Sequence, residues 1–89
     1  MRSRLTEDFI ERFARLPPAV KEQARSSYRR WKANPRHPSL VFKRIHAHEP
    51  IYSVRIGIDW RAVGLIEDGG ITWFWIGSHA EYDKLISRL

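Results

Sequence analysis

Residues 73–83 read Trp-Phe-Trp-Ile-Gly-Ser-His-Ala-Glu-Tyr-Asp, and this stretch indicates how the chain folds around its most reactive side chain. The aromatic and apolar run at its start is typical of a β-strand. The run ends at Gly77-Ser78, so His79 is expected in a loop at the end of that strand. A strand end holds a side chain rigidly, and imidazole can give or take a proton near neutral pH. The segment therefore predicts a proton-transfer group at one end of a sheet.

Two helices are expected before the sheet. Thr6 is a suitable N-cap for the first, and the apolar residues at positions 9, 10, 13 and 16 recur at helical spacing. Pro17-Pro18 ends that helix and can begin the next, which is expected to run to about Ala33, before Asn34-Pro35. The two helices are expected to form a short hairpin.

Four strands and a last helix account for the rest of the chain. The strands are expected at residues 41–46, 51–56, 60–66 and 71–76, and the helix at residues 80–89. Asp68-Gly69-Gly70 is a strong hairpin signal between the last two strands. The fourth strand is apolar on both faces, which predicts a central position or helix cover. The sequence thus predicts one α+β domain over residues 1–89: a helical hairpin packed on a four-stranded antiparallel sheet, with a short C-terminal helix.

The charge of the chain is unevenly distributed. The net charge is +6, with 12 Lys/Arg against 4 Asp/Glu in residues 1–48 (+8) and 4 against 6 in residues 49–89 (−2). A polyanion such as nucleic acid fits this field. An acidic protein partner would fit it equally well, and so would a solvated surface with no partner.

Composition narrows the setting. The chain has no cysteine, so neither disulfides nor thiolate metal sites hold the fold, and the four histidines give no compact metal-ligand cluster. No apolar run approaches the roughly 20 residues that a membrane helix needs. We therefore expect a cytoplasmic protein without a membrane partner.

An ordered set of segments resembles the RelE/ParE superfamily of toxins from type II toxin–antitoxin systems, over nearly the whole chain. The segments are Asn34-Pro35, His37-Pro38-Ser39-Leu40, Phe42-Lys43-Arg44-Ile45, Tyr52-Ser53-Val54-Arg55-Ile56, Trp60-Arg61-Ala62-Val63-Gly64 and residues 73–82. The resemblance implies a RelE-like fold and a cognate antitoxin, bound in a hetero-oligomer. Members that cut RNA are ribosome-dependent endonucleases acting on mRNA in the decoding site, whereas ParE-branch relatives poison DNA gyrase.

The resemblance also implies a set of site residues. Gly77-Ser78-His79 is similar to the Gly-Thr-His ending of the YafQ-like branch, whose histidine is catalytic, and Arg61 lies where RelE-type toxins keep an arginine. His37 and Asp59 resemble the His of a His-Pro and the Asp of an Asp-Trp in that active site. The residues expected to contact RNA are Lys43, Arg44, Arg55, Trp60 and Tyr82.

These residue types suit RNA cleavage without a metal or other cofactor. The 2′-hydroxyl attacks the adjacent phosphate, which needs a base, an acid for the departing 5′-oxygen, and cations for the charge on phosphorus. His79 can supply the acid or the base, with His37 or Asp59 as its complement. The fixed fork of donors on Arg61 suits the phosphoryl group.

Departures from the YafQ-like pattern leave other interpretations open. Residues 52–56 contain no histidine, where that branch has a further one, and no tyrosine follows Tyr82. The leading expectation is an mRNA endonuclease that inhibits translation. The alternatives are a gyrase poison that binds without cutting, and an inactive partner of an antitoxin. His79 as a helix cap and Asp59 as a turn former are the corresponding structural interpretations.

Overall fold

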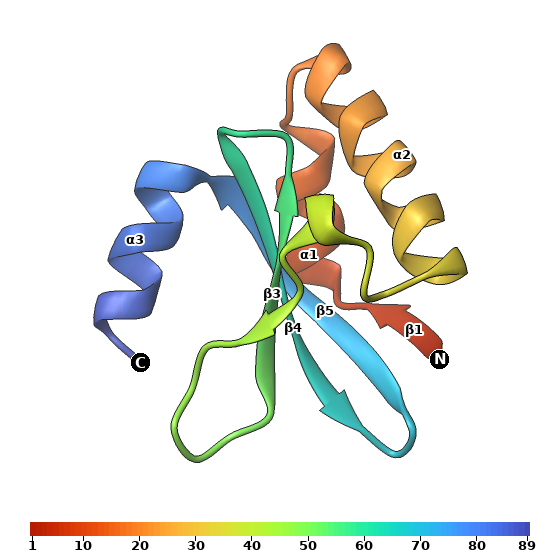
Figure 1. Ribbon diagram of the computed structural model, residues 1–89. Helices are drawn as coiled ribbons and strands as arrows, with labels where there is room; N and C mark the ends of the chain where they lie inside the picture. Colours follow the sequence, from red (N-terminus) through yellow and green to blue (C-terminus); the bar gives the residue numbers. More distant parts are fainter.

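The computed structural model describes residues 1–89 as three α-helices, one short 3-10 helix and five strands (Figure 1). In chain order these are β1 (Arg2–Leu5), α1 (Glu7–Ala14), α2 (Pro18–Ala33), η1 (Pro38–Leu40), β2 (Lys43–Arg44), β3 (Ile51–Ile56), β4 (Trp60–Glu67), β5 (Gly70–Ser78) and α3 (His79–Ser87). No helix combines the length and the apolar character that crossing a bilayer requires.

The sheet differs from the expected one at its first strand. Its order is β1-β5-β4-β3-β2, with β1 parallel to β5 and the other neighbours antiparallel, so the prediction of four antiparallel strands was wrong by one parallel edge strand. Nothing in Arg2 to Leu5 alternates as an amphipathic strand does. The strand exists because β5 supplies its hydrogen-bond partners, while α2 holds it through the Ser3–Tyr28 hydroxyl contact and a bond from Lys32 Nζ to the Met1 carbonyl (3.2 Å).

The structure confirms the predicted helix cap, the end of the second helix and the hairpin turn. Thr6 is the N-cap of α1 and its hydroxyl accepts from the Phe9 amide (3.1 Å), and α2 ends at Ala33 as predicted. Asp68 and Gly69 have φ of 51° and 73°, the left-handed pair that a tight hairpin turn needs. These local signals are strong because each is satisfied within a few residues.

Strand β2 is only two residues long, against the six expected at positions 41–46. Val41 has a φ of 43°, a left-handed conformation that ends η1 and is incompatible with a strand. After β2, Arg44 draws the loop around itself by donating to the carbonyls of His46, His48 and Glu49. The Ile45 amide makes the last bond to β3, to the Ile51 carbonyl (2.8 Å), and the chain then leaves the sheet.

The two faces of the sheet are covered by different helices. On one face, α1 and α2 pack over a core that includes Trp31, Leu40 and Trp73, and on the other α3 packs through Tyr82 against Val63 and Trp75 (Figure 1). A β-bulge makes this possible, since Val63 pairs with Trp75 and Gly64 with Trp73, leaving Phe74 as an extra residue. Strand β5 is thus internal and apolar on both faces, as predicted.

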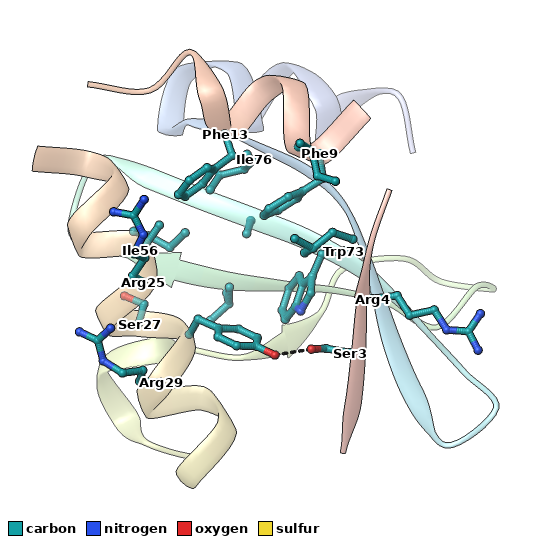
Figure 2. Close-up of a pocket in the computed structure, with 16 residues that line it drawn as sticks. Ser3, Arg4, Phe9, Phe13, Arg25, Ser27, Arg29, Ile56, Trp73 and Ile76 are labelled. Atoms are coloured by element: carbon teal, nitrogen blue, oxygen red, sulfur yellow. Dashed lines mark hydrogen bonds between the residues drawn. The ribbon is translucent and has the colours of Figure 1, made fainter. Parts of the chain in front are cut away.

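The two N-terminal helices do not close on each other as the expected hairpin would. A cavity of about 620 Å³, which we call the helix groove, lies between α1, α2 and β1 above the sheet (Figure 2). Its walls are mostly apolar, and basic side chains occur along it. The residues that line it include Phe9, Ile10, Phe13, Arg4, Arg25 and Arg29.

Candidate active site

Two arginines face each other on the α3 side of the sheet. Arg55 on β3 is the direct cross-strand partner of Arg61 on β4, an arrangement in which like charges repel. The four ion pairs of the structure include neither of them. Arg55 Nε donates to the Gly57 carbonyl (3.2 Å), and Arg61 Nη1 donates to those of Trp60 (2.7 Å) and Ile58 (3.2 Å).

The surroundings of Arg61 oppose its charge. Burial, and then the charge of Arg55, lower the pKa of Arg61 below its ordinary value, against weaker opposite effects of Tyr82, Asp83 and Asp59. Two guanidinium groups without a carboxylate partner form a site that an anion would stabilise. The fold thus maintains an unfavourable charge pair where a phosphate would relieve it.

Tyr82 supports both Arg61 and His79. Its side chain is 5% exposed, and its hydroxyl donates to Ser53 Oγ on β3 (2.9 Å). The guanidinium carbon of Arg61 lies 5.9 Å from the centre of the Tyr82 ring, and the imidazole of His79 lies edge-on to the same ring at 6.2 Å. The burial corrects the interpretation of Tyr82 as an RNA contact, because its ring packs against the sheet and lies next to Arg61 and His79.

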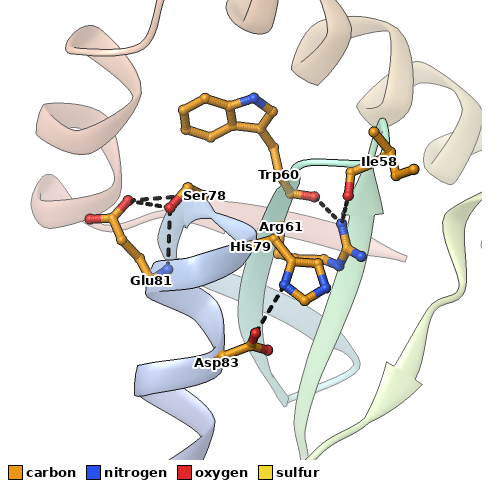
Figure 3. A network of polar contacts seen from close by, with 7 residues as sticks. All are labelled: Ile58, Trp60, Arg61, Ser78, His79, Glu81 and Asp83. Carbon is orange, nitrogen blue, oxygen red and sulfur yellow. Dashed lines mark hydrogen bonds and ion pairs between the residues drawn. The ribbon is translucent and has the colours of Figure 1, made fainter.

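His79 is the first residue of α3 and does not lie in a loop, which corrects the expectation for it. The helix begins there because Ser78 is its N-cap, accepting from the Glu81 amide while Glu81 accepts from the Ser78 amide (3.1 Å). The His79 amide donates to the Asp59 carbonyl (2.7 Å), which ties the helix start to the β3–β4 turn. Nδ1 of the ring lies 3.1 Å from Asp83 Oδ2, one turn further along α3 (Figure 3).

The cap of α3 should be sensitive to acid. Hydrogen bonds from the Ser78 backbone and hydroxyl lower the pKa of Glu81 below the ordinary 4.5. A lowered folded-state pKa stabilises the protein above the unfolded-state pKa, and this contribution is lost as the pH falls through the folded value. Glu81→Gln should therefore reduce the free energy of unfolding by about 0.5 kcal/mol at pH 7 and by a smaller amount at pH 3, where more of the wild-type carboxylate is protonated. Urea titrations at both pH values measure this.

Glu11→Gln is the matched control for the Glu81 experiment, because Glu11 lies in the body of α1 and makes no side-chain hydrogen bond. Its effect should be small and the same at both pH values. An equal loss at pH 7 and pH 3 for Glu81→Gln would show that the carboxylate charge does not stabilise the start of α3.

Other expected site residues lie apart from this group. His37 caps η1, its Nδ1 accepting from the Ser39 amide (3.2 Å), and no contact joins it to Arg61 or His79. Trp60 packs against the core on the α1/α2 face, opposite to Arg61. Asp59 lies in the β3–β4 turn, close enough for its charge to act on Arg61. Of the four residues expected to be catalytic, the structure brings together Arg61, His79 and Asp59.

Lys43 and Arg44 separate onto opposite faces of β2. Lys43 is paired with Ser53 and so shares the face of Arg55 and Arg61, whereas Arg44 is paired with Tyr52. The Arg44 guanidinium is occupied by loop carbonyls. Lys43, Arg55 and Arg61 therefore form the basic set on the α3 side of the sheet.

Two residues of the site were not anticipated. Asp83 contacts His79, and Ser53 holds the Tyr82 hydroxyl. The spacing of four residues between His79 and Asp83 was a usable signal for Asp83, because such residues are neighbours on a helix. No sequence pattern pointed to Ser53. The structure contains no group of three or more His, Cys, Asp or Glu side chains arranged to hold a metal ion.

Comparison with models of known protein families shows the family to which the chain belongs. Residues 18–84 match the family model of the ParE-like toxin domain, which covers most of the chain. The chain belongs to the family of ParE-like toxin domains. The toxin domain is thereby a member of the RelE/ParE superfamily, as the resemblance implied. A comparison of its sequence with curated proteins found no match.

Solved structures give the same fold for the toxin domain. A chain of the RelB–RelE antitoxin–toxin complex from Methanococcus jannaschii superposes with a TM-score of 0.73 at 11% identity, over 92% of this chain and 96% of that one. YafQ from Escherichia coli superposes with a TM-score of 0.69 at 11% identity, over 91% of this chain and 96% of that one. The YoeB/ParE toxin from Agrobacterium tumefaciens gives 0.70 at 15% identity, over 89% and 99%. At these identities the likeness shows a shared RelE-like fold.

Proposed function

We propose that this toxin domain cleaves mRNA and so inhibits translation. The observation that carries the proposal is that Arg61 and His79 lie against the same buried Tyr82 ring, with Arg55 directly across the strand pair. One site thus offers two cations for a phosphate and an imidazole for proton transfer. A protein that acts by binding alone has no need of the imidazole.

We propose the following chemistry for these groups. The 2′-oxygen attacks the adjacent phosphorus and gives its proton to the Asp59 carboxylate, while the bond from phosphorus to the 5′-oxygen breaks. Protonated His79 gives its proton to that 5′-oxygen. Arg61 and Arg55 stabilise the charge on the phosphoryl oxygens. The products are a 2′,3′-cyclic phosphate and a 5′-hydroxyl, so the substrate must be RNA.

Messages on ribosomes are the proposed substrate, following the RNA-cutting members of the superfamily. Lys43 lies on the same face as Arg55 and Arg61, so the flanking phosphates of an extended strand meet further positive charge. Programmed ribosomes incubated with the protein should release message fragments that end in a cyclic phosphate. A message with a 2′-deoxy residue at the cleavage site should remain intact. Cleavage of that message would exclude the proposed attack.

A gyrase poison is the second candidate, and the match to the ParE-like family model favours it. Under this interpretation the basic surface binds a protein and nothing is cut. Induction would then produce double-strand DNA breaks and leave messages intact. Intact DNA together with cut messages would support the nuclease.

We further propose that the helix groove binds the antitoxin, through a segment that is apolar on one side and acidic at its flanks. Figure 2 shows Phe9 and Phe13 of α1 and apolar side chains of the sheet facing a common space, with Arg25 and Arg29 of α2 at its edge, whereas the Arg4 side chain extends away from it. Ile10 lines this space and is 52% exposed, so its apolar side chain is accessible to a partner. The M. jannaschii relative is itself part of an antitoxin–toxin complex.

Ile10→Lys should weaken antitoxin binding at least 10-fold, because it replaces an apolar contact in the groove with a charge that the apolar side of the partner would have to desolvate. Calorimetric titration of the variant with its cognate antitoxin measures this. Leu89→Lys changes a similarly exposed apolar residue at the end of the chain and should bind normally. Equal affinities for the two variants would place the antitoxin on another surface.

A further inference from the structure

Helix α3 carries a second side chain that faces the imidazole of His79. Asp83 Oδ2 lies 3.1 Å from His79 Nδ1, and this is the one hydrogen bond that the Asp83 carboxylate makes (Figure 3). The two side chains are 47% and 63% exposed. An ion pair this open to water adds little to the stability of a fold. The main effect of this pair is therefore on the imidazole ring of His79 and not on the stability of the fold.

The carboxylate determines which ring nitrogen is available. An ionised carboxylate can only accept hydrogen bonds, so the His79 nitrogen that faces it must carry a proton. In a neutral imidazole, the ring nitrogen that donates this bond carries the only proton, so the other nitrogen is unprotonated. With Nδ1–H committed to Asp83, Nε2 is the atom left to exchange a proton with a substrate.

The position of the ring is also constrained. Tyr82 meets it edge-on at 6.2 Å with an interplanar angle of 78°, and Tyr82 is itself fixed by Ser53. The His79 backbone amide is held by the Asp59 carbonyl at the start of α3. The Arg61 guanidinium lies over the same Tyr82 ring. With Nδ1 bonded to Asp83 and the ring packed beside Tyr82, the imidazole is held in one orientation on the side of the sheet where Arg61 lies.

We propose that Asp83 is a positioning residue, which holds His79 in the Nδ1–H form and makes Nε2 the nitrogen that transfers the proton beside Arg61. The reaction it serves rests on the nuclease function proposed above. The state of the ring does not depend on that function and can be measured by itself.

Nitrogen NMR of the histidine rings in the full chain tests the proposal directly. Four histidines are present, and His79→Gln identifies the signal of His79. With the ring neutral, wild-type His79 should show the Nδ1–H form. Asp83→Ala should convert it largely to the Nε2–H form, and Asp83→Glu, which reaches the ring from the same helix face, should restore it. An unchanged ring in Asp83→Ala, or an Nε2–H ring in the wild type, would overturn the proposal.

Cleavage of messages on programmed ribosomes gives the second measurement. Asp83→Ala should lower kcat roughly 10- to 100-fold, with KM changed less than about threefold, and Asp83→Glu should recover most of it. Asp8→Asn, which removes the equivalent exposed pair with Arg12 on α1, should leave kcat and the ring signal unchanged. An unchanged kcat in Asp83→Ala would overturn the positioning role. If wild-type protein cuts no RNA, the nuclease function fails, and the ring measurement still decides whether Asp83 positions His79.

Discussion

Arg61→Ala is expected to abolish growth arrest when the toxin domain is induced, with RNA cleavage reduced by roughly 10²- to 10³-fold. Arg61 offers a planar fork of donors to the phosphoryl oxygens, and the Tyr82 ring beneath it keeps the fork in place. Removing the side chain leaves the developing charge to Arg55 alone. Growth curves and fragment yields from programmed ribosomes measure the loss.

The size of the effect depends on geometry as well as charge. Arg61→Lys keeps a cation but loses the fork, so it should recover only a small part of the activity. Arg88→Ala, which removes an exposed arginine just after α3, is the matched control and should remain toxic. Arg61→Ala should fold and bind antitoxin normally, because the bonds of Arg61 go to the carbonyls of Ile58 and Trp60 at the start of β4 and not to the core. Intact killing by this variant would remove Arg61 from the mechanism.

Trp31→Ala is expected to have the largest effect on folding, a loss of about 3–5 kcal/mol in the free energy of unfolding. The side chain is 1% exposed and joins α2 to the sheet, with its ring edge-on to those of Phe42 (5.8 Å) and Trp73 (5.3 Å). The total free energy of unfolding expected for a domain of this length is roughly 4–13 kcal/mol. The variant should therefore be largely unfolded in buffer or unfold at a much lower urea concentration than the wild type.

Two further variants separate volume from polarity in this core. The Trp31 indole nitrogen is buried without a hydrogen-bond partner, so Trp31→Phe loses volume but also removes an unpaired donor. Trp31→Phe should therefore lower the free energy of unfolding clearly less than Trp31→Ala does. Tyr28→Ala, next to Trp31 but 40% exposed, should also cost less. Equal losses for Tyr28→Ala and Trp31→Ala would show that Trp31 is not the residue that anchors α2.

Most of the fold could be predicted because its signals are local. The Thr6 cap, the prolines between the helices and the Asp68-Gly69 turn each act within a few residues of sequence. Strand β1 could not be predicted, since its hydrogen bonds come from β5, about 70 positions away. The helix groove was missed for a similar reason: helical spacing gives the apolar face of α1 but not its distance from α2.

The site was predictable in its residue types and less so in its contacts. Arg61 and His79 were expected from the resemblance, and the sheet places them at one ring. Strand alternation could have excluded Trp60, because neighbours on a strand point to opposite faces. Nothing in the sequence distinguished an exposed Tyr82 from a buried one, since that depends on how α3 lies on the sheet.

The parallel pairing of β1 with β5 has a consequence for synthesis of the chain. A chain emerging from the ribosome exposes its first residues long before the strand that must receive them, so the sheet cannot be completed until translation has passed Ser78. His79 and Asp83 come later still. A polypeptide that stops before β5 therefore lacks the partner of its opening strand, together with the histidine and aspartate of α3.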